Sequence, residues 1–448
     1  MAERIDTLRR DDLSRAWAPY EPDARRPWNL ALAAHLYRRA GFGTRWEQLQ
    51  QALADGPRRT VDRLLRPDAD IDAFNRGFDE NENATGSIEG LQAWWLRRMI
   101  ETPHPLLEKM TLFWHSHLAT SAEAVNSPSL MRAHIQFLRC GALGSFASLL
   151  EGISRDPAML VGLGAGANRK AAPNEGFARP LLQTFTLGAG AFDETDVREA
   201  ARALTGWFVL RERLRYIPRE HDDTAKQVLG RQGNFTADDI RRMVLEHPAT
   251  SRTLVRKLYR WLISESDEPS DASIAPLADS FARDYDIARL VETMLRSNLF
   301  FSPQAYRRRV KSPVEYAVGI VTASEAIVST TQLAKDVAGL GQSLYYPPTV
   351  RGWSGGQHWI STATMVRRHN LAAALLADDG PYGGKLNPWA LAQRHGSSSP
   401  DSAARFLADL LVQSDPPEWG LPESRRDSSS LVRALARLVM TLPEFQLA

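Results

Sequence analysis

Apolar residues recur at every third or fourth position through most of the chain, which is the spacing of an amphipathic helix. Segments in which apolar and polar residues alternate, as in a half-buried strand, are nearly absent. Glycine or proline follows several periodic segments, as at Gly41 and at Gly56-Pro57, and marks where helices end. The pattern predicts an all-α protein with helices over residues 28–40, 44–55, 60–65, 91–101, 106–118, 129–140, 145–153, 177–187, 196–204, 237–245, 251–263, 274–283, 287–296, 312–327, 365–377, 403–411 and 430–439.

These helices are expected to form one large multi-helix domain with long ordered loops. A chain of 448 residues is long enough for two or three domains, but no internal repeat divides it. We therefore expect an N-terminal extension over residues 1–27 and a single helical domain over residues 28–446. Polar, serine-rich stretches predict solvated connectors near residues 264–273 and 396–402.

The charge balance argues against partners that are recruited by long-range electrostatics. The chain has 55 basic and 53 acidic residues, a net charge of +2, which gives no field for gathering nucleic acid or an anionic membrane. No apolar run approaches the ~20 residues that span a bilayer, and the charged N-terminus lacks the apolar core of a signal peptide. We expect no nucleic-acid partner and no membrane span, and the sequence as written predicts a cytoplasmic protein.

A single cysteine, Cys140, narrows the possible chemistry. It rules out an intramolecular disulfide and any multi-thiolate zinc or iron–sulfur site. Its apolar neighbours in the sequence predict a buried small side chain rather than a nucleophile. Phosphate-binding loops, His-Glu-x-x-His and Gly-x-Ser-x-Gly are also absent from the sequence. The candidate chemistry therefore lies with histidine, carboxylate and arginine side chains.

Two histidines near the end of one predicted helix are the first candidates for a site. Successive helical residues lie about 100° apart, so Glu108 and His115 share one face and His117 lies on the opposite face. His115 and His117 therefore cannot bind one metal ion from a regular helix. Each is a candidate metal ligand, because neutral imidazole is the commonest protein ligand for metals, and His115 is also a candidate general base. Alternatively, each is a hydrogen-bonded histidine among Phe113 and Trp114.

A polar loop and the helix that follows it contain a second group of candidates. Asn174 is expected to cap that helix, with Glu175 in the first turn, where the helix dipole favours a carboxylate. Alternatively, Glu175 is a catalytic or metal-binding carboxylate, with Arg169 and Lys170 beside it in a substrate pocket. The loop belongs to the long irregular stretch 160–175, and long ordered loops in a compact domain tend to be functional.

The next predicted helix contains two arginines four residues apart on one face. Arg198 and Arg202 lie close to Glu199 in this helix, for which Thr195 is a natural N-cap. A structural ion-pair network is one interpretation of this pattern. The alternative is an anion-binding pair, because guanidinium groups match carboxylate and phosphate groups.

Four ionisable residues lie within six positions of the irregular stretch 209–236. They are His221, Asp222, Asp223 and Lys226. Two carboxylates beside a histidine and a lysine are typical of a hard-cation site or of an acid–base cluster. His221 is therefore a candidate catalytic residue, and the two aspartates are candidate metal ligands.

The segment 347–359 is rich in glycine and tryptophan and has no regular pattern. Glycine allows another part of the chain or a ligand to approach the backbone closely, and tryptophan offers a flat face. Arg351 and Trp353 are therefore candidates for binding a carbohydrate or an aromatic substrate. Alternatively, Trp353 packs against the body of the protein.

Polar residues set among aromatics and glycines recur in five segments that resemble one bacterial family, the domain of unknown function 1800 family. The segments are Glu108-Lys-Met-Thr-Leu-Phe-Trp-His-Ser-His117 and residues 168–175, 198–207, 311–315 and 347–356. The resemblance extends over most of the chain, from about residue 28 to residue 445. In that family, two further glutamates usually follow Glu175 and resemble the carboxylates of helical metal sites. Pro180 and Gln183 replace them here.

The resemblance also implies a setting for the protein. Members of the family are often exported and are often encoded beside a second family that looks sulfatase-like. The resemblance therefore implies a sulfatase-like partner protein.

Two functions fit these observations. The first is a metal-assisted enzyme in which the five segments converge on a polar pocket and use a divalent metal on a polar or anionic substrate. Its catalytic residues are expected to be His115, Glu175 and His221; its metal ligands His115, His117, Glu175, Asp222 and Asp223; and its substrate-binding residues Arg169, Lys170, Arg198, Arg202, Arg351 and Trp353. The second is a non-catalytic envelope, scaffold or binding protein that works with the sulfatase-like partner. In that case the same segments are buried networks that fix a large helical fold.

Overall fold

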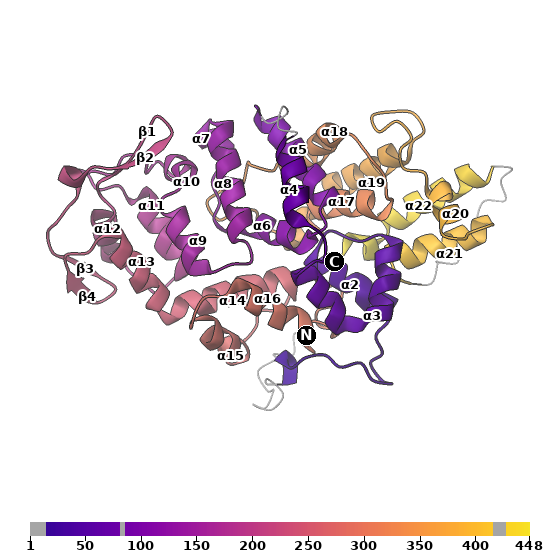
Figure 1. The fold of residues 1–448 in the computed structure, drawn as a ribbon, viewed down its shortest axis with the longest axis horizontal. Coiled ribbons are helices and arrows are strands. Elements are labelled where there is room, and N and C mark those ends of the chain that lie inside the picture. Colours follow the sequence, from indigo (N-terminus) through magenta and orange to yellow (C-terminus); the bar gives the residue numbers. More distant parts are fainter. Residues whose placement is uncertain (1–14, 81–85, 415–426) are drawn as a thin grey trace.

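Helices form nearly all of the regular structure in the computed structural model, which describes residues 15–80, 86–414 and 427–448. Strands in these residues are confined to two small hairpins. The all-α prediction is therefore confirmed, and one continuous cluster of buried apolar side chains runs through the described chain. In Figure 1, helices α9 to α13 lie at one end of an elongated molecule and α19 to α22 at the other, with α2 to α6 between them.

Most of the helices are joined by short connections, whereas residues 163–174, 204–236, 297–312 and 340–361 form long connections. The helices of the N-terminal half are α2 (Leu30–Ala40), α3 (Trp46–Leu65), α4 (Ile71–Glu80), α5 (Ile88–Glu101), α6 (Pro105–His117), α7 (Ala122–Val125), α8 (Pro128–Gly141), α9 (Phe146–Ile153), α10 (Pro157–Gly162), α11 (Glu175–Pro180) and α12 (Glu194–Ala203). Those of the C-terminal half are α13 (Ala237–Glu246), α14 (Pro248–Leu262), α15 (Asp271–Phe281), α16 (Ile287–Arg296), α17 (Pro313–Ala323), α18 (Thr330–Gly339), α19 (Thr362–Leu376), α20 (Pro388–Arg394), α21 (Pro400–Leu411) and α22 (Ser428–Thr441).

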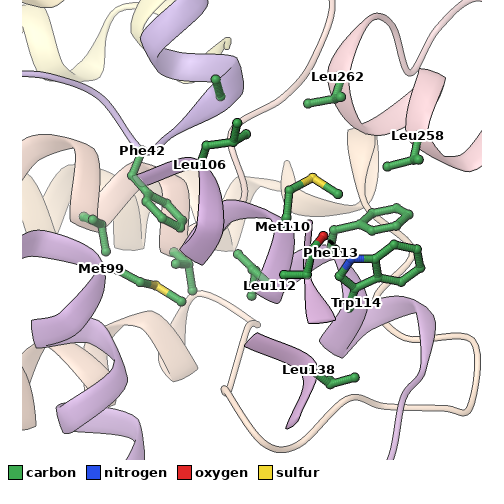
Figure 2. Packing of buried hydrophobic residues seen from close by; sticks show 14 of the residues in the cluster. Phe42, Met99, Leu106, Met110, Leu112, Phe113, Trp114, Leu138, Leu258 and Leu262 are labelled. Carbon is green, nitrogen blue, oxygen red and sulfur yellow. Dashed lines mark hydrogen bonds between the residues drawn. The ribbon is translucent and has the colours of Figure 1, made fainter. Parts of the chain in front are cut away.

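Helix α6 is the centre of the core. It packs against α2, α3, α5 and α8, and ten of its 13 residues are buried. Figure 2 shows Met110, Phe113 and Trp114 of α6 in one cluster with Leu138 of α8 and Leu258 of α14. A helix that is buried on all sides has to satisfy its polar side chains within the protein. Its histidines, glutamate and lysine therefore have to find protein partners.

Several helix boundaries differ from the prediction for local reasons. The helices expected over residues 44–55 and 60–65 are joined as α3. The joined helix has a kink at Gly56, whose φ of +77° is a left-handed conformation. The N-cap of α12 is Asp193 and not Thr195, because the Asp193 carboxylate accepts from two backbone N–H groups. Helix α11 ends at Pro180, and a π-helical turn over Leu181–Thr186 continues it.

Two hairpins interrupt the stretch 209–236, which was expected to be irregular. Strand β1 (Trp207–Leu210) pairs antiparallel with β2 (Arg213–Tyr216), and β3 (Lys226–Val228) pairs antiparallel with β4 (Arg231–Gly233). Each strand has only three or four residues, which is too short for an alternating pattern to be recognised in the sequence.

Cys140 and two segments near the surface have surroundings that their sequences did not indicate. Cys140 is exposed on the outer side of α8, and the prediction that it is buried is wrong. Residues 15–27, the described part of the expected extension, bury Trp17 and Tyr20 and bond to the body, where Tyr20 N donates to the Arg296 carbonyl oxygen at 2.7 Å. Ser264, expected in a solvated connector, is fully buried.

Within residues 15–80, 86–414 and 427–448, no helix combines the length and the apolar character that crossing a membrane demands.

Candidate functional site

Glu108, at the start of α6, is the centre of a buried charge network. Its carboxylate is fully buried and accepts from Trp95 Nε1 (2.9 Å), Arg98 Nε (2.7 Å) and Arg139 Nε (2.8 Å). Burial raises the pKa of Glu108, but the Arg139 and Arg98 guanidinium groups outweigh burial and lower it. The network joins α5, α6 and α8, and these contacts favour a structural role for Glu108.

The next residue, Lys109, belongs to a second buried network. Its Nζ donates to the Glu315 carboxylate and to the Gly41 carbonyl oxygen (2.8 Å). Glu315 also accepts from Arg309 Nη1 (3.0 Å) and from the backbone N–H of Ser312 (2.7 Å). Burial lowers the pKa of Lys109 to about 8, although the Glu315 carboxylate opposes this shift. The network fixes the segment before α17 against α6 and holds the Arg309 guanidinium in place.

His115 is fully buried among aromatic rings on the α5 side of α6. Its Nε2 accepts from the backbone N–H of Tyr345 (3.1 Å), and its ring centroid lies 5.5 Å from that of Trp95 and 5.4 Å from that of Trp353. Burial lowers the pKa of His115 to about 3, so the imidazole is neutral. These contacts favour the alternative in which His115 is a hydrogen-bonded core histidine.

A cavity of about 520 Å³ opens beside the C-terminal half of α6. Its walls come from α6, from α14, from the segment before α17 and from the loop 349–359. Three residues predicted from the sequence line it, namely His117, Arg351 and Trp353. The other chemically important lining residues are Ser116, Lys257, Arg260, Trp261, Glu265, Arg309 and Trp359.

The loop that forms one wall approaches the end of α6 so closely that only glycine fits at position 352. Gly352 has a φ of +73°, and a Cβ atom there would lie 2.1 Å from the Ser116 carbonyl oxygen. The N–H of Trp353 then donates to Ser116 Oγ (3.4 Å). The close backbone approach that the glycines predicted is therefore confirmed. It seats Trp353 over His115 and leaves Arg351 at the cavity.

Lys257 of α14 and His117 at the end of α6 form a fixed pair in this cavity. Lys257 Nζ donates to His117 Nδ1 (2.9 Å) and to the Thr184 carbonyl oxygen (2.7 Å). His117 Nε2 lies 3.1 Å from the Phe185 carbonyl oxygen, so we assign the imidazole proton to Nε2 and the acceptor role to Nδ1. Burial lowers the pKa of His117 well below its usual value, and the Lys257 charge adds to this shift. His117 is therefore neutral at physiological pH.

The cavity has an excess of positive charge. Its lining has four cationic side chains, Lys257, Arg260, Arg309 and Arg351, and one carboxylate, Glu265, which is an excess of three. Glu265 Oε1 lies 3.4 Å from Arg309 Nε. In the described part of the chain, Lys257, Arg260 and Arg351 have no carboxylate partner. Burial lowers the pKa of Lys257 to about 8, and the Arg351 charge adds to this shift.

Glu175, Arg169 and Lys170 do not line the cavity. Glu175 begins α11 directly after Asn174, which caps the helix as predicted. The Glu175 carboxylate accepts from Arg179 Nη2 (2.7 Å) on the same helix. Arg169 and Lys170 are exposed. These contacts favour the alternative in which Glu175 stabilises the first turn of a helix.

Arg198 and Arg202 have different surroundings although both lie on α12. Arg202 donates to Asp222 Oδ2 (2.7 Å) and to Glu199 Oε2 (2.6 Å), and these bonds raise its pKa. Burial raises the pKa of Asp222. The hydrogen bonds that the carboxylate accepts from Arg202 and Thr224 together outweigh burial and lower the pKa. Arg198 is exposed and donates to the Thr195 hydroxyl (3.2 Å). The contacts of Arg202 favour the structural ion-pair network.

The predicted acid–base cluster after residue 220 is a loop that bonds to its own backbone. His221 Nδ1 lies 3.0 Å from the Thr205 carbonyl oxygen. The buried Lys226 donates from Nζ to the Asp222 carbonyl oxygen (2.5 Å). Asp223 is exposed. Lys226 also donates to the Thr224 carbonyl oxygen (2.9 Å), and these bonds favour a structural role for the lysine in fixing the loop.

The predicted metal ligands are distributed over these separate surroundings. His115 lies in the core, His117 lies in the cavity, and the three carboxylates lie at α11 and in the loop after residue 220. In the residues that the structure describes, no three or more His, Cys, Asp or Glu side chains are grouped so that they could hold one metal ion. The expected ligand set His115, His117, Glu175, Asp222 and Asp223 is therefore not brought together.

Most of the cationic side chains that line the cavity were not predicted from the sequence. Lys257, Arg260 and Trp261 have the spacing i, i+3 and i+4, which places them on one face of α14. The rarity of lysine offered a second signal for Lys257, because only seven of the 55 basic residues are lysines. Glu265 was assigned to a solvated connector, and Arg309 carries no local signal.

Comparison with known proteins places the whole of this arrangement in one family. No curated protein and no solved structure matches the chain. The family described as protein of unknown function (DUF1800) matches residues 35–447. This range includes α6, α14 and the loop 349–359, so the cavity lies entirely within the matched region. As its motifs predicted, the chain belongs to the DUF1800 family.

Proposed function

We propose that the cavity beside α6 binds a small ligand that has an anionic group and a flat apolar part. The observation that carries this proposal is the excess of positive charge in the lining, where Arg260 and Arg351 have no carboxylate partner among the described residues. Guanidinium groups suit carboxylate, phosphate and sulfate groups because they form two parallel hydrogen bonds to such oxygens. An anion at Arg351 and Arg260 offsets the repulsion among the cationic side chains.

The aromatic walls support the apolar part of this proposal. Trp261, Trp353 and Trp359 all line the cavity and offer flat faces. The Arg309 guanidinium lies 4.6 Å from the Trp261 ring centroid, which holds that indole in position. The volume of about 520 Å³ falls within the roughly 300–1,000 Å³ of small-molecule sites. A ligand of one or two rings therefore suits the cavity.

A ligand series separates the anionic group from the ring. We expect benzoate, phenyl phosphate or phenyl sulfate to bind in a calorimetric titration, whereas neutral benzamide, which has the same ring, binds far more weakly. The tightest of the three anions identifies the preferred group. Failure of all three anions to bind folded protein contradicts the proposal.

Two arginine variants locate the binding site. A hydrogen bond to a charged group contributes about 1.5–3 kcal/mol, so Arg351→Gln should weaken binding of the preferred anion about 10- to 150-fold. Arg198→Gln is the matched control, because Arg198 is also an exposed arginine but lies outside the cavity. An effect of Arg198→Gln without an effect of Arg351→Gln moves the site to α12 and contradicts the assignment to the cavity.

A metal-assisted reaction and a sulfatase-like partner remain separate proposals from the sequence. Elemental analysis of tag-free protein tests the first, with His117→Ala as the variant because His117 is the predicted ligand that lines the cavity. Co-purification from the native source tests the second. The networks around Glu108 and Glu315 favour the alternative in which those polar segments stabilise the fold.

A further inference from the structure

We propose that Lys257 is a nucleophile that forms an imine with a carbonyl compound, and that this compound carries the anionic group bound by Arg351 and Arg260. The proposal rests on the anion site proposed above and adds a reaction to it. The ligand class is that of 2-oxo acids, in which a carboxylate lies next to the reacting carbonyl carbon.

The hydrogen bonds of Lys257 suit a neutral amine. A neutral amine has two N–H donors and one lone pair, and Lys257 Nζ has two acceptors, His117 Nδ1 at 2.9 Å and the Thr184 carbonyl oxygen at 2.7 Å. Neither acceptor is charged, because His117 keeps its proton on Nε2 beside the Phe185 carbonyl oxygen. No other described residue bonds to Nζ, and Lys257 lines the cavity. The third position of Nζ is therefore available to a ligand.

The charges around Lys257 also favour the free amine. No carboxylate among the described residues pairs with Lys257, and the guanidinium groups of Arg260 and Arg351 line the same cavity. Lysines next to another cationic group are activated in this way.

The reaction balances without any further reagent. The Nζ lone pair attacks the carbonyl carbon, a C–N bond forms, and the C=O electron pair moves to oxygen. One proton passes from nitrogen to that oxygen, which gives a carbinolamine. The C–O bond then breaks, and hydroxide leaves and takes the second nitrogen proton, so that the products are the imine and one water molecule. The carboxylate of the ligand stays at the arginines throughout.

The other lysines lack one or more of these features. Lys109 is paired with the Glu315 carboxylate, and Lys226 donates to carbonyl oxygens of its own loop. Lys311 is buried against the Phe445 ring, beside a cavity of only about 30 Å³. The remaining three, Lys170, Lys335 and Lys385, are exposed. A site-specific reaction therefore has internal controls in the same chain.

Reductive trapping tests the imine. Folded protein is incubated at pH 7 with phenylpyruvate and sodium cyanoborohydride, and the secondary amine is located by peptide mass mapping. We expect Lys257 to be modified at least 10-fold faster than Lys335. Equal rates at the two lysines, or faster modification of Lys311, overturn the proposal. Lys257→Arg, checked for an unchanged circular dichroism spectrum, should lose the fast phase, and its persistence also overturns the proposal.

Phenyllactate separates failure of this step from failure of the anion site. It has the same ring and carboxylate as phenylpyruvate but a hydroxyl in place of the carbonyl, so it can bind and cannot form an imine. If wild-type protein binds phenyllactate but phenylpyruvate gives no fast modification of Lys257, the anion site stands and the nucleophile is rejected. If neither compound binds, both proposals fall.

Discussion

Replacing Glu315 by glutamine should destabilise the protein strongly although it changes the side-chain volume very little. Glu315 is 2% exposed and is the common acceptor for Lys109, for Arg309 Nη1 (3.0 Å) and for the backbone N–H of Ser312 (2.7 Å). Glutamine keeps one carbonyl oxygen but turns an NH₂ group toward these donors. The buried Lys109 and Arg309 side chains then have no carboxylate at position 315.

The magnitude follows from the cost of an uncompensated buried charge. Removing one partner of a buried ion pair costs about 3–5 kcal/mol. The bond between Glu315 and the Ser312 N–H is also part of the capping box of α17, and the side-chain oxygen of glutamine can keep this bond. The expected loss therefore comes from the ion pairs alone and totals about 3–5 kcal/mol. This is a large fraction of the 5–15 kcal/mol by which a domain is stable.

Urea denaturation of wild type and variant, followed by circular dichroism at pH 7, measures this loss. The matched control is Glu101→Gln, because Glu101 pairs with Arg97 on the surface of α5 at 38% side-chain exposure. An exposed pair of this kind contributes less than about 0.5 kcal/mol. If Glu315→Gln shifts the midpoint no more than Glu101→Gln at an unchanged denaturant slope, the buried-network reasoning is refuted.

Three further predictions follow from the same contacts. Glu108→Gln removes the buried carboxylate that accepts from Arg98 and Arg139 and should cost about 3–5 kcal/mol in the same urea assay. Burial lowers the pKa of His35, His115 and His117 in the folded state, so the unfolded chain binds more protons below pH ~6.5 and stability is lost as the pH falls. Between pH 7.5 and pH 5.5 each should cost about 1.4 kcal/mol, and His115→Gln should remove about that amount from the pH dependence of stability; an unchanged dependence contradicts the assignment. Gly352→Ala places a Cβ atom 2.1 Å from the Ser116 carbonyl oxygen and should displace the loop, so binding of the preferred anion should weaken at least 10-fold in calorimetry.

Helical periodicity was sufficient to predict the longer helices and failed for the shortest elements. Helices α7 and α10 have four and six residues, which is less than two turns and too short to show a period. The hairpin strands of three or four residues were missed for the same reason. Helices α4 and α18, each with ten residues, were long enough to be found but were not predicted.

The 100° spacing of helical residues correctly predicted that His115 and His117 lie on opposite faces of α6. His115 faces Trp95 and Tyr345, whereas His117 faces Phe185 and the cavity. This spacing does not show that both faces are buried, because burial depends on helices that pack against α6 from distant parts of the chain. The polar residues of the five family segments were therefore expected to converge on one pocket, whereas most of them bond to one another.

The cavity itself could not be predicted from local patterns. Lys257 and His117 are 140 positions apart in the chain and meet only because α14 packs beside the end of α6. Arg351 reaches the same place through a loop whose path depends on Gly352. The sequence therefore indicated Arg351 and Trp353 as candidates because of their residue types. Only the fold shows which cationic side chains lie beside them.

The most direct test of the anion site is a crystal structure of the protein soaked with 4-bromobenzoate, recorded at the bromine absorption edge. The account predicts an anomalous peak in the cavity near Trp261 and Trp353, with the carboxylate within hydrogen-bonding distance of Arg351. The bromine fixes the position of the ring, and the opposite end of the ligand shows which cation binds the charge. A peak outside this cavity, or a ligand that lies in it with its carboxylate turned away from Arg351 and Arg260, would contradict the central claim.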